Sequence, residues 1–132
     1  MSIYKFTSPL FLRLSASKKA KAYRLNLNQY RNWHYQVSNN LKVKYKQVMS
    51  DQLSGFKLKP PVEIKFTLYN DSKRRIDRSN VLSIQEKFFC DALVELGCMK
   101  DDNDNYIIRT SYESGEVSPN NGRVEIEIKE IK

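Results

Sequence analysis

Hydrophobic positions follow a helical period in two parts of the chain. Between Val81 and Leu96 they recur at steps of three and four residues, which predicts a helix with one buried stripe. Gly97 follows directly and suits the left-handed conformation that ends many helices. A second helix is predicted from Asn28, a suitable N-cap, to about Leu53. Its stripe consists of Tyr30, Trp33, Val37, Leu41, Tyr45 and Val48.

A period of two predicts strands elsewhere. Residues 62–69 read V-E-I-K-F-T-L-Y, with apolar residues on one face, and Pro60-Pro61 breaks the chain before them. Shorter alternating runs predict strands at 3–6, 106–112 and 124–131, and Asn121-Gly122 favours a turn before the last of these. The pattern predicts an α+β fold, a small mixed sheet with helices packed on it, in a single domain spanning residues 1–132.

Composition narrows the class of protein. The chain has 132 residues, 40% of them hydrophobic, and contains no apolar run long enough to predict a membrane span. Its N-terminus lacks the apolar core of a signal peptide. The two cysteines, Cys90 and Cys98, and the lone His34 do not form a zinc-binding motif. We therefore expect a cytoplasmic protein with reduced thiols and no membrane partner.

Charge is divided unevenly along the chain. Residues 1–60 contain 12 Lys or Arg and a single acid, Asp51, whereas residues 61–132 contain 11 Lys or Arg and 14 Asp or Glu. A metal-dependent nuclease needs both signs, because its metal ligands are anionic and its grip on DNA is cationic. The distribution therefore favours a nuclease over a DNA-binding protein that is basic throughout.

The stretch 73–105 carries the candidate chemistry. Asp77 precedes the predicted helix, and Asn80, Lys87 and Asp91 fall on one line along it. A turn at Gly97 can bring residues 101 and 102, both Asp, back towards that line. Carboxylates from separate segments, beside a lysine and a basic run, indicate a hard metal ion facing phosphate. Taken alone, the run D-D-N-D-N at 101–105 is also typical of a polar turn, and it does not fit the EF-hand pattern.

These residues resemble the RusA family of Holliday junction resolvases. The resemblance rests on Arg74-Arg75, Asp77, Asn80, Lys87, Asp91-Ala92-Leu93, Gly97 and Asp101-Asp102, and it covers the chain from about residue 62 onwards. It implies a small α+β domain that dimerises and cleaves four-way DNA junctions with Mg²⁺, in a bacterial or phage-infected cell. It also implies that Asp77 and Asp102 hold the metal, with Asp101 as their neighbour, and that Lys87 is needed for cleavage.

The chain departs from the family pattern at two points. Ser79 stands where the second carboxylate of Asp-x-Asp-Asn belongs, and the segment from Asn80 to Lys87 is about one helical turn longer. Either Asp91 or Asp101 supplies the missing metal ligand, or the protein is a weakened or inactive module that binds DNA without cutting it.

Basic and aromatic residues give further candidates for DNA binding, each with a second interpretation. One group flanks Asp77 and would contact phosphates, or would neutralise nearby acids: Lys73, Arg74, Arg75 and Arg78. Another lies in a predicted mobile loop that would close on DNA, or would be a solvated loop: Lys18, Lys19 and Lys21. The rings of Tyr30, Trp33 and Tyr35 would stack on splayed bases, or would belong to the core.

Resolving a junction requires two nicks, and the chain has one carboxylate cluster and no internal repeat. We therefore expect a two-fold symmetric homodimer. Two apolar surfaces are candidates for its interface: the face formed by Val124, Ile126 and Ile128, and the helix at 30–48.

Overall fold

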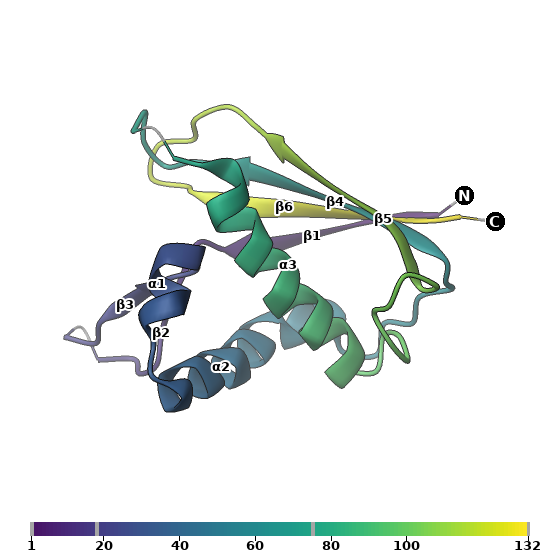
Figure 1. Cartoon of the computed structure of the whole chain (residues 1–132), viewed down its shortest axis with the longest axis horizontal. Coiled ribbons are helices and arrows are strands. Elements are labelled where there is room, and N and C mark those ends of the chain that lie inside the picture. The colour runs from purple at the N-terminus through teal and green to yellow at the C-terminus, as the bar shows by residue number, and fades with distance from the viewer. Residues whose placement is uncertain (1, 18, 75, 132) are drawn as a thin grey trace.

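The computed structural model describes residues 2–17, 19–74 and 76–131, which form a four-stranded sheet, a two-stranded sheet and three helices (Figure 1). The helices lie on one side of the larger sheet. The elements in chain order are β1 (Ile3–Pro9), β2 (Phe11–Arg13), β3 (Ala22–Arg24), α1 (Leu27–Asn32), α2 (Tyr35–Leu53), β4 (Val62–Tyr69), α3 (Arg78–Glu95), β5 (Ile107–Ser114) and β6 (Arg123–Glu130). This arrangement confirms the predicted α+β class.

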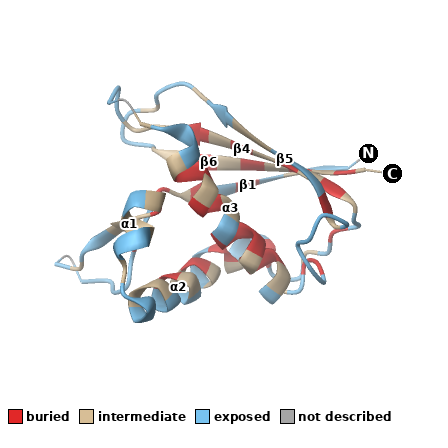
Figure 2. Cartoon of the chain, in the orientation of Figure 1, coloured by how far each residue is buried: buried red, intermediate tan, exposed pale blue. Residues whose placement is uncertain are grey.

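The larger sheet has the strand order β1-β6-β4-β5. Pairing is antiparallel from β1 through β6 to β4, and parallel between β4 and β5, which α3 connects. Strand β4 has the predicted bounds, and its alternation buries Val62, Ile64, Phe66 and Leu68 on the helix side. Strand β6 likewise buries Val124, Ile126 and Ile128 (Figure 2). These three residues therefore belong to the core, and they do not form the exposed apolar face that we considered for dimerisation.

Helix α3 lies across the sheet and has the predicted buried stripe. Phe88, Phe89 and Leu93 are almost fully buried, as are six further residues of the helix. The helix ends as the sequence predicts, because Gly97 adopts a φ of +81°, which is costly for residues with a Cβ atom. One face of α3 is thus fixed against the core, and its other side carries the candidate site residues.

The helix predicted from Asn28 to Leu53 is two helices, and this prediction was wrong in two respects. Asn26, not Asn28, caps α1, and its side chain accepts a hydrogen bond of 2.8 Å from the Gln29 amide. The chain then leaves the helical conformation at Trp33 and His34, and the His34 Nδ1 caps α2 by accepting from the Gln36 amide at 3.2 Å. Sequence periodicity continues across this break because Trp33 still packs against the core.

The buried stripe of α2 also differs from the prediction. Its buried residues are Leu41, Tyr45, Met49 and Leu53, at a regular step of four. Val48, which we assigned to the stripe, is 41% exposed. A step of four drifts slowly around a helix of 3.6 residues per turn, so the contact line departs from the one drawn through Val48.

Residues 10–24, for which no element was predicted, contain a small antiparallel ribbon. Strands β2 and β3 pair Leu12 with Tyr23, and Leu12 is buried against the core. The basic segment 15–21 connects the two strands, and Figure 1 shows this ribbon projecting from the sheet next to α1.

A buried chain of hydrogen bonds joins β1, α2 and α3. The Ser8 hydroxyl donates to Gln85 Oε1 at 2.5 Å and lies 2.7 Å from the Tyr45 hydroxyl. Gln85 Nε2 donates in turn to the Pro9 carbonyl at 2.8 Å. Ser8, Tyr45 and Gln85 are all fully buried, so these polar groups have one another in place of water. This Ser8–Tyr45–Gln85 chain fixes α3 two residues before Lys87.

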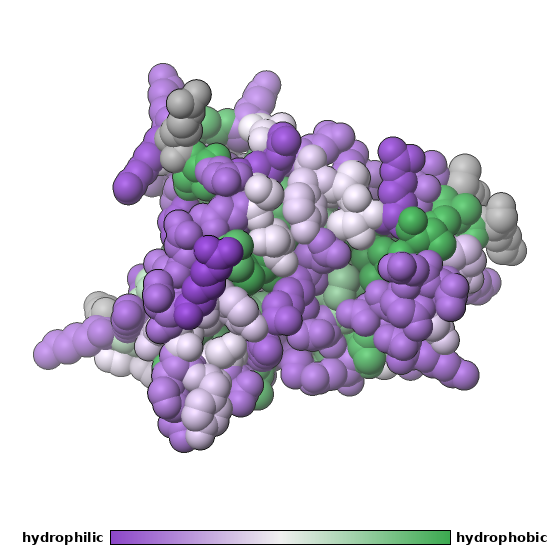
Figure 3. Space-filling view, in the orientation of Figure 1, coloured by the Kyte–Doolittle hydropathy of each residue, from purple (hydrophilic) through white to green (hydrophobic). Residues whose placement is uncertain are grey.

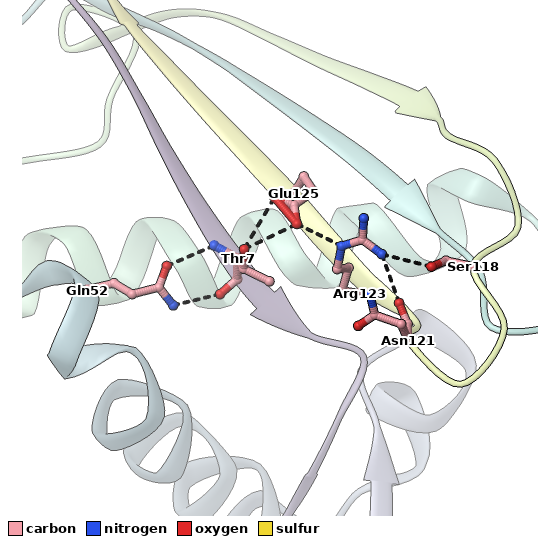
Figure 4. A network of polar contacts seen from close by, with 6 residues as sticks. All are labelled: Thr7, Gln52, Ser118, Asn121, Arg123 and Glu125. Carbon is pink, nitrogen blue, oxygen red and sulfur yellow. Dashed lines mark hydrogen bonds and ion pairs between the residues drawn. The ribbon is translucent and has the colours of Figure 1, made fainter.

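A second network lies at the edge of the sheet (Figure 4). The Gln52 side-chain amide pairs with both backbone groups of Thr7, with each hydrogen bond 2.8 Å long. The Thr7 hydroxyl donates to Glu125 on β6 at 3.2 Å, and Glu125 also pairs with Arg123 at 2.8 Å. Gln52 thus occupies hydrogen-bonding positions that β1 would otherwise offer to another strand.

Candidate active site

The N-terminus of α3 is capped by Asp77. Its Oδ1 accepts hydrogen bonds from the Ser79 amide at 3.1 Å and from the Ser79 hydroxyl at 2.9 Å. A carboxylate in this position stabilises a helix by satisfying free amides and by facing the positive end of the helix dipole. The Ser79 side chain therefore helps to hold Asp77 as a cap.

A cavity of about 460 Å³ lies further along α3 and brings together three predicted site residues, Lys87, Asp91 and Asp102. Asp102 comes from the loop after Gly97, so the predicted return of this loop to the helix is confirmed. Asp101 is exposed, and its Oδ1 accepts a hydrogen bond of 2.7 Å from the Asp102 amide. The loop residue Asp101 thus braces the backbone of its neighbour.

Five further polar residues line this cavity that were not predicted as site residues: Ser83, Glu86, Asp104, Thr110 and Tyr112. Tyr112 donates a short hydrogen bond to Glu86, which connects β5 to α3. Asp104 is part of the acidic run that had already been noted, so it was detectable. Tyr112 gave no signal, because only the parallel pairing of β4 with β5 brings it beside the helix.

The second predicted metal ligand, Asp77, lies in a different cavity. This cavity also measures about 460 Å³ and is lined by Asn80 and Arg74 from the α3 side and by Arg24 and Asn28 from the N-terminal half. Asp77 precedes Asp91 by fourteen positions, which corresponds to about 21 Å of helix at 1.5 Å per residue. Within one chain the predicted carboxylates are therefore divided between two places.

The ligand geometry agrees with this division. Among residues 2–17, 19–74 and 76–131, no three His, Cys, Asp or Glu side chains lie close enough to hold a metal ion together. The Asp91–Asp102 cavity thus offers carboxylates beside one another without a closed ligand cage.

The Asp91–Asp102 cavity is lined by four acids, Glu86, Asp91, Asp102 and Asp104, and by one lysine, Lys87. Partial desolvation raises the pKa of Asp102 above its ordinary value although its side chain is exposed, and the neighbouring Asp101 and Asp91 raise it further. Burial raises the pKa of the Cys90 thiol, as do the charges of Glu86, Asp102 and Asp91. Burial also raises the pKa of Tyr112, and Glu86 adds to the effect, so this phenol is a neutral donor. A cation entering the cavity would offset the part of these shifts that comes from neighbouring negative charges.

Lys87 is exposed at the border of this cavity. Its Nζ lies 5.9 Å from the centre of the Tyr30 ring, which is within the range of a cation–π contact. No ion pair of Lys87 within 4 Å occurs in the part of the chain that the structure describes. Its charge is consequently available to an anionic ligand.

The predicted phosphate-binding residues lie in two places, one at the start of α3 and one between β2 and β3. Lys73 and Arg74 are exposed in the loop before α3, and Arg78 Nη1 donates to the Ser114 hydroxyl at 3.3 Å. Lys19 and Lys21 are exposed between β2 and β3, and Lys21 Nζ lies 5.1 Å from the Tyr23 ring. The two remaining candidates, Lys18 and Arg75, lie outside the described residues.

The three aromatic residues that would either stack on bases or belong to the core differ in their exposure. Tyr30 and Trp33 are partly buried and pack against the core, whereas Tyr35 is 67% exposed.

No protein-family model matches the chain, and no curated protein matches it either. Over the described residues, no helix combines the length and the apolar character needed to cross a membrane.

Proposed function

We propose that the protein is a magnesium-dependent endonuclease that hydrolyses phosphodiesters in branched DNA such as four-way junctions. The observation that carries the proposal is the cavity in which Lys87 lies beside Asp91 and Asp102. Anionic ligands next to a free cation are what a phosphate-cleaving site requires. The resemblance to the RusA family supplies the substrate class.

The residues of this cavity fit Mg²⁺. Magnesium retains several waters and is commonly held by one or two carboxylates together with substrate phosphates, so a cage of three protein ligands is not required. Asp91 and Asp102 would hold it, and the pKa of Asp102 is raised by partial desolvation and by the neighbouring Asp101 and Asp91, whose negative charges a bound cation would offset. When bound, the ion would activate water and neutralise phosphate charge.

The protein's own groups then have distinct tasks. Lys87 offers its ammonium group to the negative charge that develops on the phosphate during cleavage. The Tyr112 hydroxyl holds Glu86 by its hydrogen bond, which keeps that carboxylate directed at the β5 side of the cavity. The exposed Lys73 and Arg74 would attract the DNA backbone towards the N-terminal end of α3, and Lys19 and Lys21 would attract it towards the segment between β2 and β3.

We further propose a cytoplasmic homodimer, because two opposed nicks require two sites. Both cysteines, Cys90 and Cys98, are buried and free, which suits a reducing compartment.

Cleavage of a labelled four-way junction, with and without Mg²⁺, tests this function. We expect Asp102→Asn to abolish nicking, and Lys87→Ala to slow it by about 100- to 1,000-fold, the usual cost of one charge-stabilising group. Junction binding, measured by gel shift, should be retained or tighter for Asp102→Asn because the change removes negative charge. Glu95→Gln is the matched control, since Glu95 is an exposed acid of α3 that pairs with Lys46 outside the cavity. Nicking by Asp102→Asn at the wild-type rate would refute the site.

Asp77→Asn tests the second cavity. Asparagine is as good an N-cap as aspartate, so this change removes charge while preserving the start of α3. Loss of nicking would assign Asp77 to the reaction, as the resemblance implies.

The alternative function is a DNA-binding module without catalysis. The observation that favours it is the Ser79 hydroxyl, which occupies an oxygen of Asp77 where the family pattern has a second carboxylate. Tight junction binding with no nicking at any Mg²⁺ concentration would support this alternative.

A further inference from the structure

A cavity of about 440 Å³ lies where α1 meets α2, and neither proposed metal ligands nor acidic residues line it. Its walls include three aromatic rings and two cations: Tyr30, Trp33, Tyr35, Arg31 and Lys42. In Figure 3, this region at the lower left shows pale side chains among strongly hydrophilic ones. Its composition differs from that of the acidic cavity on α3.

Two of the three rings pack against the core, and the third, that of Tyr35, is exposed to solvent. Trp33 packs edge-on against Tyr30 at 5.7 Å and against Phe88 of α3 at 6.5 Å, so the core holds it in place. Tyr35 is the first residue of α2 and lies 4.6 Å from the His34 ring at a tilt of 32°. Because Tyr35 is 67% exposed, its ring is accessible to a planar ligand.

The charges around these rings suit an anion attached to that planar group. No ion pair of Arg31 or Lys42 within 4 Å occurs in residues 2–17, 19–74 and 76–131. Lys42 Nζ lies 6.0 Å from the Tyr30 ring, and Lys87 Nζ lies 5.9 Å from the same ring. Since Lys87 also lines the acidic cavity, the Lys87–Tyr30 contact joins the two cavities.

We propose that this aromatic–basic cavity binds an unstacked nucleotide of a DNA strand, with its base against Tyr35 and Trp33 and its phosphate against Arg31 and Lys42. Aromatic rings beside cations are the usual means of holding single-stranded nucleic acid without sequence preference. The proposal rests on the proposed function, because it takes DNA as the substrate. It also gives a physical reason for selecting branched DNA: bases in a continuous duplex remain stacked on one another, whereas bases at a branch point can be splayed out.

The single tryptophan of the chain, Trp33, lies in the cavity and reports its occupancy. The experiment titrates the whole protein with short oligothymidylate in EDTA and follows Trp33 fluorescence, so that no cleavage is needed. An abasic strand of the same length has the same phosphates without bases and separates stacking from charge attraction. We expect oligothymidylate to quench Trp33 and to bind more tightly than the abasic strand.

Substitutions then assign the contact. Tyr35→Ala should weaken binding of oligothymidylate by roughly 5- to 150-fold, the range for one stacked base, while leaving the abasic strand nearly unchanged. Tyr35→Phe should retain the affinity, because it keeps the ring. Lys42→Ala should weaken binding of both strands, because it removes a phosphate contact. The matched control is Phe11→Ala, which removes an exposed ring of β2 outside the cavity.

Three results would overturn the proposal: equal affinity for the abasic strand and oligothymidylate, unchanged affinity in Tyr35→Ala, or no binding at all. Base-dependent binding lost in Tyr35→Ala, in a protein that nicks no junction, would uphold the cavity and reject the nuclease. Nicking of a junction by the protein, with no effect of Tyr35→Ala on binding, would uphold the nuclease and reject the aromatic–basic cavity as a binding site.

Discussion

The Ser8–Tyr45–Gln85 chain of hydrogen bonds predicts that substitutions of its members change the free energy of unfolding by unequal and non-additive amounts. Ser8 has one hydroxyl proton, which it donates to Gln85 Oε1, so the Tyr45 hydroxyl must donate to Ser8 Oγ. Burial raises the pKa of Tyr45, which keeps this donor protonated. The chain therefore has a direction, and its members are not equivalent.

Removing different members should have different costs. Tyr45→Phe removes one hydrogen bond and leaves Ser8 paired with Gln85, at a cost of about 0.5–1.5 kcal/mol. Ser8→Ala leaves two buried groups without partners, the Tyr45 O–H and Gln85 Oε1. At about 1–3 kcal/mol each, this costs roughly 2–6 kcal/mol. Against a typical stability of about 5–15 kcal/mol, the second change approaches the limit of folding.

The double variant Ser8→Ala/Tyr45→Phe should be as stable as Ser8→Ala alone, or more stable. It removes the hydroxyl that Ser8→Ala leaves unpaired, so the two costs are not additive. Urea unfolding followed by Trp33 fluorescence measures all three variants. With a slope of about 2 kcal/mol per M, Ser8→Ala should lower the midpoint by roughly 1–3 M. A double variant less stable than Ser8→Ala by the full cost of Tyr45→Phe would refute the directional chain.

Three further predictions concern the charged residues and the assembly. Asp102→Asn should raise the midpoint of thermal unfolding at pH 7, because the raised pKa of Asp102 means that its ionised carboxylate destabilises the fold. The gain should vanish towards about pH 4, near the pKa of the carboxyl group in the unfolded chain. A lower midpoint at pH 7 would contradict this prediction. Changing Lys18, Lys19 and Lys21 to Ala should flatten the log–log salt dependence of duplex binding by up to about 2.7, and an unchanged slope would show that these lysines touch no phosphate. Light scattering should find two chains per particle with junction DNA, whereas single chains that still cleave would exclude the homodimer.

The sequence predicted the regular elements well where burial alone determines them. Strand β4 has the predicted bounds because every second residue faces the helices, and α3 ends just before Gly97, which adopts a φ that few other residues tolerate. The break between α1 and α2 could not be predicted in this way. It depends on His34 capping α2 with its ring nitrogen, an uncommon cap, while the apolar period continues through it.

The sequence predicted which site residues share one face of α3, but it did not predict how far apart they lie along the helix. Helical periodicity placed Asn80, Lys87 and Asp91 on one face of the helix. It gives no account of the rise along the helix axis, which separates Asn80 from Asp91 and puts them in different cavities. The return of Asp102 was predictable from the turn at Gly97. The contribution of Tyr112 was not, because it depends on which strand pairs with β4.

The position of β6 between β1 and β4 has a consequence for folding. Ile3 pairs with Lys129, so the first strand of the sequence pairs with the last, at a sequence separation of more than a hundred residues. Such long-range pairing requires a large loop to close before its contacts form, which slows folding. Until residues 123–130 are in place, β1 has no partner in the larger sheet and one edge of β4 is open. Because β6 is the strand that joins β1 to β4, a chain shortened within β6 should lose the attachment of β1 to the sheet as well as β6 itself.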